Sequence, residues 1–531
     1  MTVAAAPDKM LDRLRGLLEE YDLAERLVVD PDTLTLFSSD LVLPGAYRPF
    51  AALRPTSVEE VQTLALVCRR LELSVEIRGA GLSYSGGYLA QGPDSVVLDL
   101  SVLRSISAHV GSSNVVCVEA GVTWQALDES LAGSGMRPCL QAPISGSRST
   151  IAASIRQGMP SDMTGVCALE IVTAEGELLR TGALATDMNF SPLWRGQGPD
   201  LTGLFIGDCG AFGILTRAWI KLEKIPRHRA FFACALPRPE DFREFVVELA
   251  APPGTLRAYC FDPGRGRSLR SQPWRESMSV ALRILAGQRG FRSRLRGVSD
   301  LVLTALSRGA GDPGDSWTVH VCFESDSPEL VFELLGRASR FARGQGWAAL
   351  TTTVAEAMAT RPYSVRGVLG QHYERWAPVS AVFDLSRADG VLSRAAEALE
   401  DSCRSSDVPG LQGSFLALST GGDHLVVEPM FLWPSALYPL HKEVVPKAEV
   451  DPCDDAARRD SAVQTLRAEL AKELDQLGGQ HVQLGRFYEY AGRLATPQLA
   501  LLEALKEHLD PGERIAKGTL GIRTPDGSPK P

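Results

Sequence analysis

The 531-residue chain is 44% hydrophobic and 22% charged, and its formal net charge is −9. This composition is typical of a globular protein with two or three domains, and the acidic balance argues against a nucleic-acid partner. The sequence has neither an apolar run long enough to span a membrane nor the apolar core of a signal peptide, so we expect a cytoplasmic protein. Its ten cysteines and eight histidines lack Cys-x-x-Cys, His-x-His or His-x-x-x-His spacing, so we expect no metal site.

The first 226 residues alternate short helices and short strands. Leucines at helical spacing predict a helix over residues 8–28, and Ser57 with Glu60 forms the capping-box pattern that begins a second helix. We expect strands at 73–77, 95–100, 115–119, 167–173, 177–181 and 215–222, with a helix at 124–131. This order is typical of an α+β protein rather than of regular βαβ repeats.

A glycine-rich segment, Arg78–Gly87, lies between the first two of these strands. Four of its glycines fall within nine positions, and a residue without Cβ lets backbone amides approach a ligand closely. Several inward-facing amides in succession form an anion-binding nest that suits a pyrophosphate. The Rossmann fingerprint requires a helix after the glycines, whereas here a second strand follows. The segment therefore predicts a dinucleotide-phosphate loop of another kind.

Longer strands and helices follow Pro226. We expect strands at 230–236 and 320–323, helices at 239–249, 328–345 and 497–509, and a loop at 309–315. The basic cluster Arg289–Arg296 is interpreted as a solvated helix face or a lid, and the tail at 524–531 is expected to fray. A second α+β domain after residue 226 is the prediction.

Four segments in order resemble the flavoproteins of the vanillyl-alcohol oxidase and p-cresol methylhydroxylase (PCMH) superfamily, in its D-lactate dehydrogenase and glycolate oxidase branch. They are residues 53–61 (LRPTSVEEV), 78–87 (RGAGLSYSGG), 143–153 (PISGSRSTIAA) and 201–216 (LTGLFIGDCGAFGILT). The closing segments 510–512 and 517–521 are similar to that branch as well. The resemblance implies a two-subdomain PCMH-type FAD-binding domain over 1–226, an α+β cap with an antiparallel sheet over 227–475, and a C-terminal segment, 476–531, that returns to the FAD domain.

The resemblance also implies which residues hold FAD. Glycine amides would bind the pyrophosphate, short hydroxyls the phosphate, ribityl and ring atoms, and small residues would let the flat ring pass. The residues expected at FAD are Arg78, Gly79, Ala80, Gly81, Leu82, Ser83, Tyr84, Gly86, Pro143, Ser145, Gly146, Ser147, Ser149, Thr150, Ala152, Gly213 and Ile214.

Two departures from the family pattern bear on chemistry. Leu82 stands where some members attach FAD through a histidine, and Gln483 stands at the second attachment position, with His481 two residues away. We therefore expect non-covalent FAD. The histidine-rich metal segment of the α-hydroxy-acid dehydrogenases is reduced to single histidines in 421–429 and 478–486, which speaks against metal-assisted chemistry.

Catalytic candidates come from the expected cap and the returning segment. Arginine is the natural partner of a substrate carboxylate, and tyrosine, histidine and glutamate can move protons. The candidates are Arg366 and Arg486 for the carboxylate, with Tyr488, Tyr490, His441 and Glu428 as bases or donors.

These residues predict an FAD-dependent oxidoreductase that takes a hydride from a hydroxylated or alkoxylated organic acid, with O2 or another molecule as electron acceptor. A homodimer is among the arrangements left open. One alternative is an oxidative decarboxylase of a β-oxygenated acid in polyketide tailoring or other secondary metabolism. Others are a flavin transferase like alkylglycerone-phosphate synthase and a flavin-less binding protein on the same scaffold.

Overall fold

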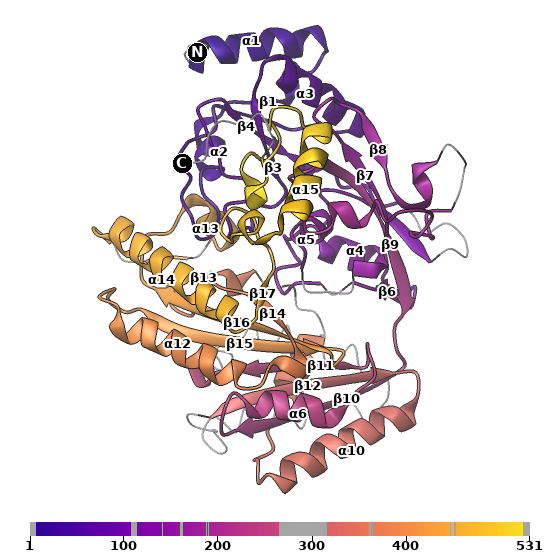
Figure 1. The fold of residues 1–531 in the computed structure, drawn as a ribbon, viewed down its shortest axis with the longest axis vertical. Coiled ribbons are helices and arrows are strands. Elements are labelled where there is room, and N and C mark those ends of the chain that lie inside the picture. The colour runs from indigo at the N-terminus through magenta and orange to yellow at the C-terminus, as the bar shows by residue number, and fades with distance from the viewer. Residues whose placement is uncertain are drawn as a thin grey trace.

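The computed structural model describes residues 7–107, 114–140, 142–159, 163–186, 188, 191–264, 316–359, 363, 365–446, 448–450 and 453–523. The expected features at 289–296, 309–315 and 524–531 lie outside these residues, as does the side chain of Arg366. In Figure 1 the chain forms an upper part, built from its two ends, and a lower part built from its middle.

A four-stranded sheet in the order β1-β2-β4-β3 forms the first subdomain. Strands β2, β4 and β3 run parallel, and β1 pairs with β2 in the antiparallel direction. The helices and strands here are α1 (Pro7–Glu20), β1 (Leu27–Val28), α2 (Pro31–Leu36), β2 (Ala51–Leu53), α3 (Val58–Arg70), β3 (Ser74–Arg78) and β4 (Ser95–Asp99).

The helix expected over residues 8–28 is shorter than predicted. It ends at Glu20 because Asp22 adopts a left-handed backbone (φ +56°), and the Leu23 amide folds back onto the Leu18 carbonyl. Strand β1 then occupies Leu27–Val28, which the leucine pattern alone assigned to the helix. The predicted start of α3 is confirmed, since the Ser57 hydroxyl accepts a hydrogen bond from the Glu60 amide at 3.2 Å.

A five-stranded antiparallel sheet forms the second subdomain, with β5, β9, β7 and β8 in order and β6 paired to β9. The expected hairpin is present as β7 and β8. The elements are β5 (Val115–Glu119), α4 (Trp124–Ser130), β6 (Met136–Pro138), α5 (Ile151–Arg156), β7 (Val166–Val172), β8 (Leu178–Arg180) and β9 (Ile214–Lys224).

The middle of the chain forms an eight-stranded antiparallel sheet, the cap sheet, in the order β10-β12-β11-β15-β16-β14-β17 with β13 beside β16. Its strands are β10 (His228–Leu236), β11 (Leu256–Phe261), β12 (Trp317–Ser325), β13 (Arg375–Pro378), β14 (Ala381–Asp384), β15 (Gln412–Thr420), β16 (His424–Trp433) and β17 (Gln480–His481). Its helices are α6 (Asp241–Leu249), α10 (Pro328–Gly344), α11 (Thr353–Ala359), α12 (Val391–Ser405), α13 (Pro439–Val444) and α14 (Ala456–Gln476).

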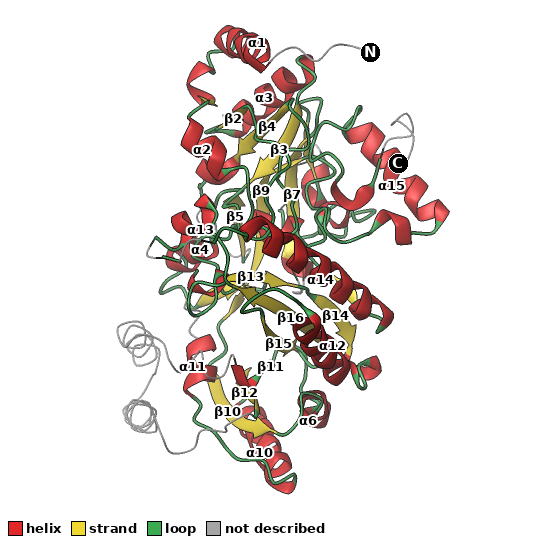
Figure 2. Cartoon of the chain, turned by 90° about the vertical axis from the view of Figure 1, so that its left-hand side faces the viewer, coloured by secondary structure: helices red, strands yellow, loops and turns green. Residues whose placement is uncertain are grey.

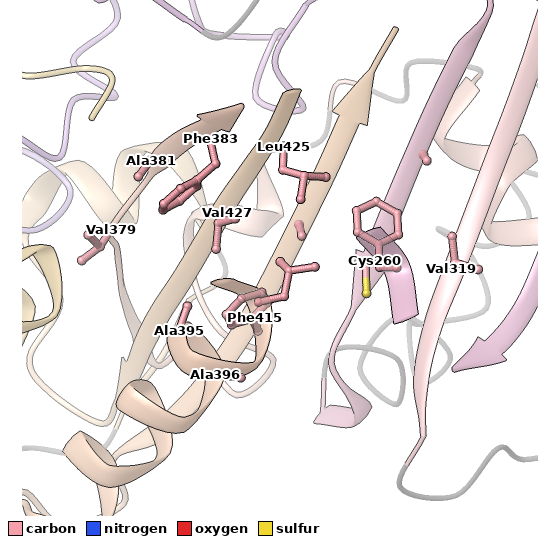
Figure 3. Packing of buried hydrophobic residues seen from close by; sticks show 14 of the residues in the cluster. Cys260, Val319, Val379, Ala381, Phe383, Ala395, Ala396, Phe415, Leu425 and Val427 are labelled. Atoms are coloured by element: carbon pink, nitrogen blue, oxygen red, sulfur yellow. The ribbon is translucent and has the colours of Figure 1, made fainter. Parts of the chain in front are cut away.

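Helices α12 and α14 lie side by side on one flank of the cap sheet in Figures 1 and 2. Figure 3 shows Ala395 and Ala396 of α12 facing Val427 and Phe415, with Val379 and Ala381 in the same layer. Successive strand residues point to opposite faces of a sheet. Glu428, which follows Val427, therefore lies on the face of β16 that points away from α12.

The C-terminal segment contacts the first subdomain. Helix α15 (Thr496–Leu509) lies in the upper part of the molecule in Figure 1. Ile515 forms a parallel bridge with Val75 of β3, and the buried Lys506 donates hydrogen bonds to the carbonyls of Ala211 and Ile515. Within the described residues, no helix combines the length and the apolar character that a membrane crossing requires. The fold is the α+β class predicted from the sequence.

Candidate active site

Strand β3 ends at Arg78, whose guanidinium organises the glycine loop. It donates hydrogen bonds to the carbonyls of Gly79 (3.1 Å) and Ala80 (3.4 Å), and it lies 4.1 Å from the centre of the Phe37 ring. Gly81 has a φ of +78°, and a Cβ there would lie 2.6 Å from Nη2 of Arg78. The left-handed backbone conformation therefore favours glycine at position 81, and a Cβ there would force the Arg78 side chain to move.

Within the described structure, the backbone amides of residues 80–83 have no hydrogen-bond acceptor. Four consecutive free amides at the end of a strand form the nest expected for a pyrophosphate. The Gly86 amide has another role, because it donates to Oδ2 of the buried Asp40 at 2.8 Å. The Gly87 amide faces the Ser83 hydroxyl at 3.5 Å. These last two glycines support the loop from within.

The stretch 143–152 lies directly against the glycine loop. A Cβ on Gly79 would lie 3.1 Å from Oγ1 of Thr150, which caps α5 through the Ala153 amide. The hydroxyls of Ser145 and Ser149 are 2.6 Å apart, and the Pro143 carbonyl accepts from the Gly146 amide at 3.1 Å. Ser147 is half-buried and Ala152 is buried. The structure thus brings together the two segments that the sequence assigned to FAD.

A residue of the cap covers this stretch. The Tyr363 ring stands where a Cβ on Gly146 would be, and the Tyr363 hydroxyl donates to the Asp128 carboxylate. Arg148 reaches α13 and donates to Oε1 of Glu443 at 2.6 Å. Residues 363 and 443 therefore contact the second subdomain at Gly146, Asp128 and Arg148.

Gly213 and Ile214 lie at the start of β9, beyond the C-terminal end of α5. The Gly213 carbonyl accepts a hydrogen bond from Arg156 at 2.8 Å, and Ile214 pairs with Val172. Arg156 also forms a buried ion pair with Asp208. Gly213 has a φ of +135° and packs against Ile171, so this turn is a close-packed part of the second subdomain.

The donor set fits FAD. A dinucleotide needs a row of amides for its phosphates and space free of Cβ atoms beside them. The free amides of residues 80–83, the glycine at 81 and the hydroxyls of Ser145 and Ser149 meet these needs. The residues present are therefore chemically suited to hold this cofactor.

The buried Tyr488 and the half-buried Glu428 belong to one polar cluster that also contains Tyr84 of the glycine loop. The Ser380 hydroxyl donates to Oε2 of Glu428 at 2.7 Å, and the Ser380 amide donates to the Tyr488 oxygen at 3.0 Å. The ring of Tyr84 meets that of Trp376 edge to face. Burial raises the pKa of Tyr84 well above its ordinary value and also raises the pKa of Tyr488.

Arg467 of α14 completes this cluster, and sequence analysis missed it. Its side chain is fully buried, its Nε donates to the Pro378 carbonyl at 2.9 Å, and its guanidinium lies 3.7 Å from the centre of the Phe487 ring. Nη1 and Nη2 meet no hydrogen-bond acceptor in the described structure. Burial lowers the pKa of Arg467, and the charge lies close to Tyr84, Tyr488 and Asp40.

A signal for Arg467 exists in the sequence. Val463, Arg467, Leu470 and Leu474 follow helical spacing, and all four are buried. An arginine on the apolar stripe of a helix either finds a buried partner or serves a ligand.

The other sequence candidates lie elsewhere. Nδ1 of His441 accepts from the Tyr438 amide at 3.0 Å, so Nε2 is the donor to the Leu41 carbonyl at 2.9 Å, and burial lowers the His441 pKa to about 3. Arg486 donates to the carbonyls of Lys517, Gly86 and Leu89 and to Oε2 of Glu76. Tyr490 packs against the hydrophobic core of the FAD-binding subdomains.

The two residues weighed for covalent attachment also have defined places. Leu82 packs against the core that includes Tyr84 and Tyr488. The His481 ring stacks on Tyr488 with centroids 4.1 Å apart, and its nitrogens face the carbonyls of Ser380 and Ala471. The Gln483 amide donates to the Gln157 carbonyl at the end of α5.

Comparisons with known proteins agree with this geometry. Residues 49–182 match a family model described as an FAD binding domain. The chain is 28% identical over 207 residues to the mitochondrial D-lactate dehydrogenase [cytochrome] of Arabidopsis thaliana. This alignment covers 38% of this chain and 35% of that protein. The chain is also 29% identical over 239 residues to glycolate oxidase subunit GlcD of Escherichia coli K12, and this alignment covers 40% of this chain and 45% of that protein. The matched regions are thus less than half the length of either relative.

The fold matches over almost the whole chain. The structure of 4-ethylphenol oxidase from Gulosibacter chungangensis superimposes with a TM-score of 0.71, covering 98% of this chain and 99% of that one at 19% sequence identity. The four ordered segments, the free loop amides and these matches confirm the resemblance stated from the sequence. Residues 49–182 thus form an FAD binding domain with FAD as cofactor, and the chain has the fold of 4-ethylphenol oxidase and p-cresol methylhydroxylase.

Proposed function

We propose that the protein is an FAD-dependent oxidoreductase that oxidises a hydroxylated or alkoxylated organic acid. Bound FAD supplies the acceptor for a hydride, and the protein supplies binding, orientation and proton transfer. The relatives named D-lactate dehydrogenase and glycolate oxidase support an acid as substrate. We propose further that FAD is held without a covalent bond and that O2 or another molecule accepts the electrons.

The observation that carries the proposal is the buried guanidinium of Arg467. A buried charge without a partner is costly, and a guanidinium fork matches a carboxylate with two parallel hydrogen bonds. Nη1 and Nη2 are the two unpaired nitrogens of such a fork. We assign to Arg467 the carboxylate-binding role that sequence analysis gave to Arg486, because Arg486 is committed to the glycine loop.

Anaerobic mixing of the FAD-loaded protein with a panel of acids tests this proposal. We expect a hydroxy or alkoxy acid to bleach the oxidised flavin. Arg467→Met should weaken binding of that acid by about 10- to 100-fold, since a charged hydrogen bond is worth about 1.5–3 kcal/mol. The affinity for the matching methyl ester should differ little between wild type and Arg467→Met, because the ester lacks the carboxylate charge that Arg467 would bind.

Stability separates this role from a structural one. Removing an unpaired buried charge relieves a desolvation cost, so Arg467→Met should leave the ligand-free protein at least as stable as wild type. A less stable variant with unchanged acid binding would show that Arg467 serves the fold. If no acid of the panel reduces the flavin of the wild-type protein, the proposed oxidation itself is contradicted.

Product mass decides between simple oxidation and the proposed alternative, oxidative decarboxylation. A keto acid or an aldehyde acid that keeps its carboxylate indicates oxidation. An alkene that has lost CO2 indicates a decarboxylase of a β-oxygenated acid. In both cases the same guanidinium would orient the carboxylate, so Arg467→Met should slow either reaction.

A further inference from the structure

Residues 39–43, which we call the bridge segment, lie between the glycine loop and the helices of the cap sheet. Helix α2, which precedes this segment, contacts α13 (Figure 1). Leu41 and Val42 are buried in the same hydrophobic cluster as the strands and helices of the cap sheet. The bridge segment lies outside the helices and strands, so its position depends on this packing and on the hydrogen bonds that it makes.

One set of hydrogen bonds ties the bridge segment to the glycine loop. The Leu41 amide donates to the Ser83 carbonyl at 3.0 Å. Oδ2 of the fully buried Asp40 accepts from the Gly86 amide at 2.8 Å. Oδ1 of Asp40 accepts from two amides of its own segment, at 2.8 and 2.6 Å. This carboxylate therefore orders the bridge segment and the glycine loop together.

A second set of hydrogen bonds ties the same segment to the cap sheet. Nε2 of His441 in α13 donates to the Leu41 carbonyl at 2.9 Å, and Nη2 of Arg375 in β13 donates to the Val42 carbonyl at 2.8 Å. Both side chains are fully buried, and Arg375 is itself paired with Asp460 of α14 at 2.8 Å. Leu41 thus donates to the glycine loop through its amide and accepts from α13 through its carbonyl.

Both ring nitrogens of His441 are engaged by backbone groups. Nδ1 accepts from the Tyr438 amide at 3.0 Å, so the ring proton is on Nε2 and is donated to the Leu41 carbonyl. Burial keeps the ring neutral, because it lowers the His441 pKa to about 3. His441 therefore has no nitrogen left for chemistry on a substrate, and its contacts lead to the bridge segment.

We propose that His441 is a positioning residue for FAD, and that through Leu41 it holds the glycine loop in the conformation that binds the pyrophosphate. This inference rests on the FAD site predicted at the glycine loop and is independent of which acid the protein oxidises. A loop that is in its binding conformation for only part of the time has an apparent Kd raised by the inverse of that fraction. The His441–Leu41 hydrogen bond keeps that fraction high, because it fixes Leu41 on the side opposite to Ser83.

Two substitutions separate the roles of the two His441 nitrogens. The side-chain amide of glutamine reaches the position of Nε2, so His441→Gln keeps a donor for the Leu41 carbonyl. The shorter asparagine reaches only the position of Nδ1, so His441→Asn loses that donor. Dilution of the FAD-loaded protein, with released flavin measured by its fluorescence, gives the Kd for FAD. We expect His441→Asn to raise this Kd about 3- to 10-fold and His441→Gln to stay within about twofold of wild type.

Two control variants separate positioning from stability. Phe245 of α6 is fully buried against Phe232 of β10, at the far edge of the cap sheet from β13. Phe245→Leu should lower the melting temperature and leave the Kd for FAD unchanged, because the substitution does not touch the bridge segment. His508→Gln, at an exposed histidine, controls for the replacement of a histidine elsewhere.

A double-variant cycle tests the route through the bridge segment. Asp40→Asn exchanges one carboxylate oxygen for an amide nitrogen, so one of the amides that Asp40 binds loses its acceptor and the Kd for FAD should rise. If both residues act through the same segment, Asp40→Asn with His441→Asn should raise the Kd by less than the product of the two single effects. Tyr88→Phe, which removes the hydroxyl 2.7 Å from the Ser39 carbonyl, replaces Asp40→Asn if that variant fails to fold.

The outcomes are distinct. If His441→Asn lowers the melting temperature but leaves the Kd for FAD unchanged, His441 serves the fold alone and the proposal is wrong. The proposal is also wrong if His441→Gln or Phe245→Leu raises the Kd as much as His441→Asn does, or if the two effects in the cycle multiply. If Gly81→Ala leaves the Kd unchanged, the glycine loop does not hold FAD and the proposal fails with that site. All of these measurements are made without an acid, so the proposed oxidation is tested separately.

Discussion

Replacing Arg486 with methionine should destabilise the protein more than any surface arginine replacement. Arg486 donates to Oε2 of Glu76 at 2.7 Å, to the Gly86 carbonyl at 2.6 Å, and to two further carbonyls. Glu76 is fully buried in β3. Burial raises the Glu76 pKa, and the adjacent Arg486 charge opposes that rise. Arg486→Met leaves this carboxyl buried without its cation.

The size of the effect follows from that burial. Breaking a buried ion pair by removing one partner costs about 3–5 kcal/mol, mostly from the charge that remains. Because the remaining charge carries the cost, Arg486→Met with Glu76→Gln should be more stable than Arg486→Met alone. Arg493→Met is the matched control, since Arg493 pairs with Asp475 at the surface and should contribute at most about 1 kcal/mol.

Urea unfolding of the FAD-free protein measures these differences, and quenching of flavin fluorescence measures FAD affinity. We expect Arg486→Met to lower both the free energy of unfolding and the affinity for FAD, because the variant releases the Gly86 carbonyl. A double variant less stable than Arg486→Met alone would refute the account of Glu76 as an uncompensated charge. Unchanged FAD affinity would refute the link to the glycine loop.

Three other changes probe separate parts of the structure. Gly81→Ala should raise the Kd for FAD about fivefold or more, from a strained φ and contact with Arg78, whereas Gly133→Ala, at a similar φ in open space, should leave that Kd unchanged. Arg137, Arg229 and Arg257 surround Glu324 and lower its pKa to about 2, against the effect of its burial. That carboxylate should stabilise the protein by roughly 3 kcal/mol above pH 4.5 and lose this contribution as pH falls towards 2, so Glu324→Gln should flatten the unfolding free energy over that range. His441 is buried neutral with a pKa of about 3, so wild type should lose stability as pH falls from 6.5 towards 3, and a His441→Gln variant that loses stability with the same slope would contradict this.

Much of the fold could be predicted because its elements carry local signals. The Ser57 cap, the strands on both sides of the glycines and the 167–181 hairpin depend on neighbouring residues, and the structure contains all three. The end of α1 could not be predicted from leucine spacing, because a left-handed turn at Asp22 ends the helix and Leu27–Val28 then pair with β2. Strand β17 likewise forms only because β14 lies beside it.

The site shows the same division. The glycine loop and the 143–152 stretch stood out in the sequence because their residue types suit phosphates and a flat ring, and the structure places the two segments against each other. The sequence could not show which loop amides lack a hydrogen-bond acceptor. The Gly86 amide, for example, donates to the side chain of Asp40, which is 46 residues away in sequence. The sequence does not distinguish the roles of Arg486 and Arg467. In the structure, Arg486 binds the glycine-loop carbonyl of Gly86, whereas Nη1 and Nη2 of Arg467 have no hydrogen-bond partner among the described residues.

The return of the C-terminal segment to the glycine loop has a consequence for the order in which the protein is made. Arg486 leaves the ribosome 400 residues after Gly86, whose carbonyl it binds, and Ile515 follows later still to pair with Val75. A nascent chain that stops within the cap contains every residue of the glycine loop but lacks the C-terminal groups that secure it. We therefore expect FAD to load only after synthesis is nearly complete, so that flavin content reports on full-length protein.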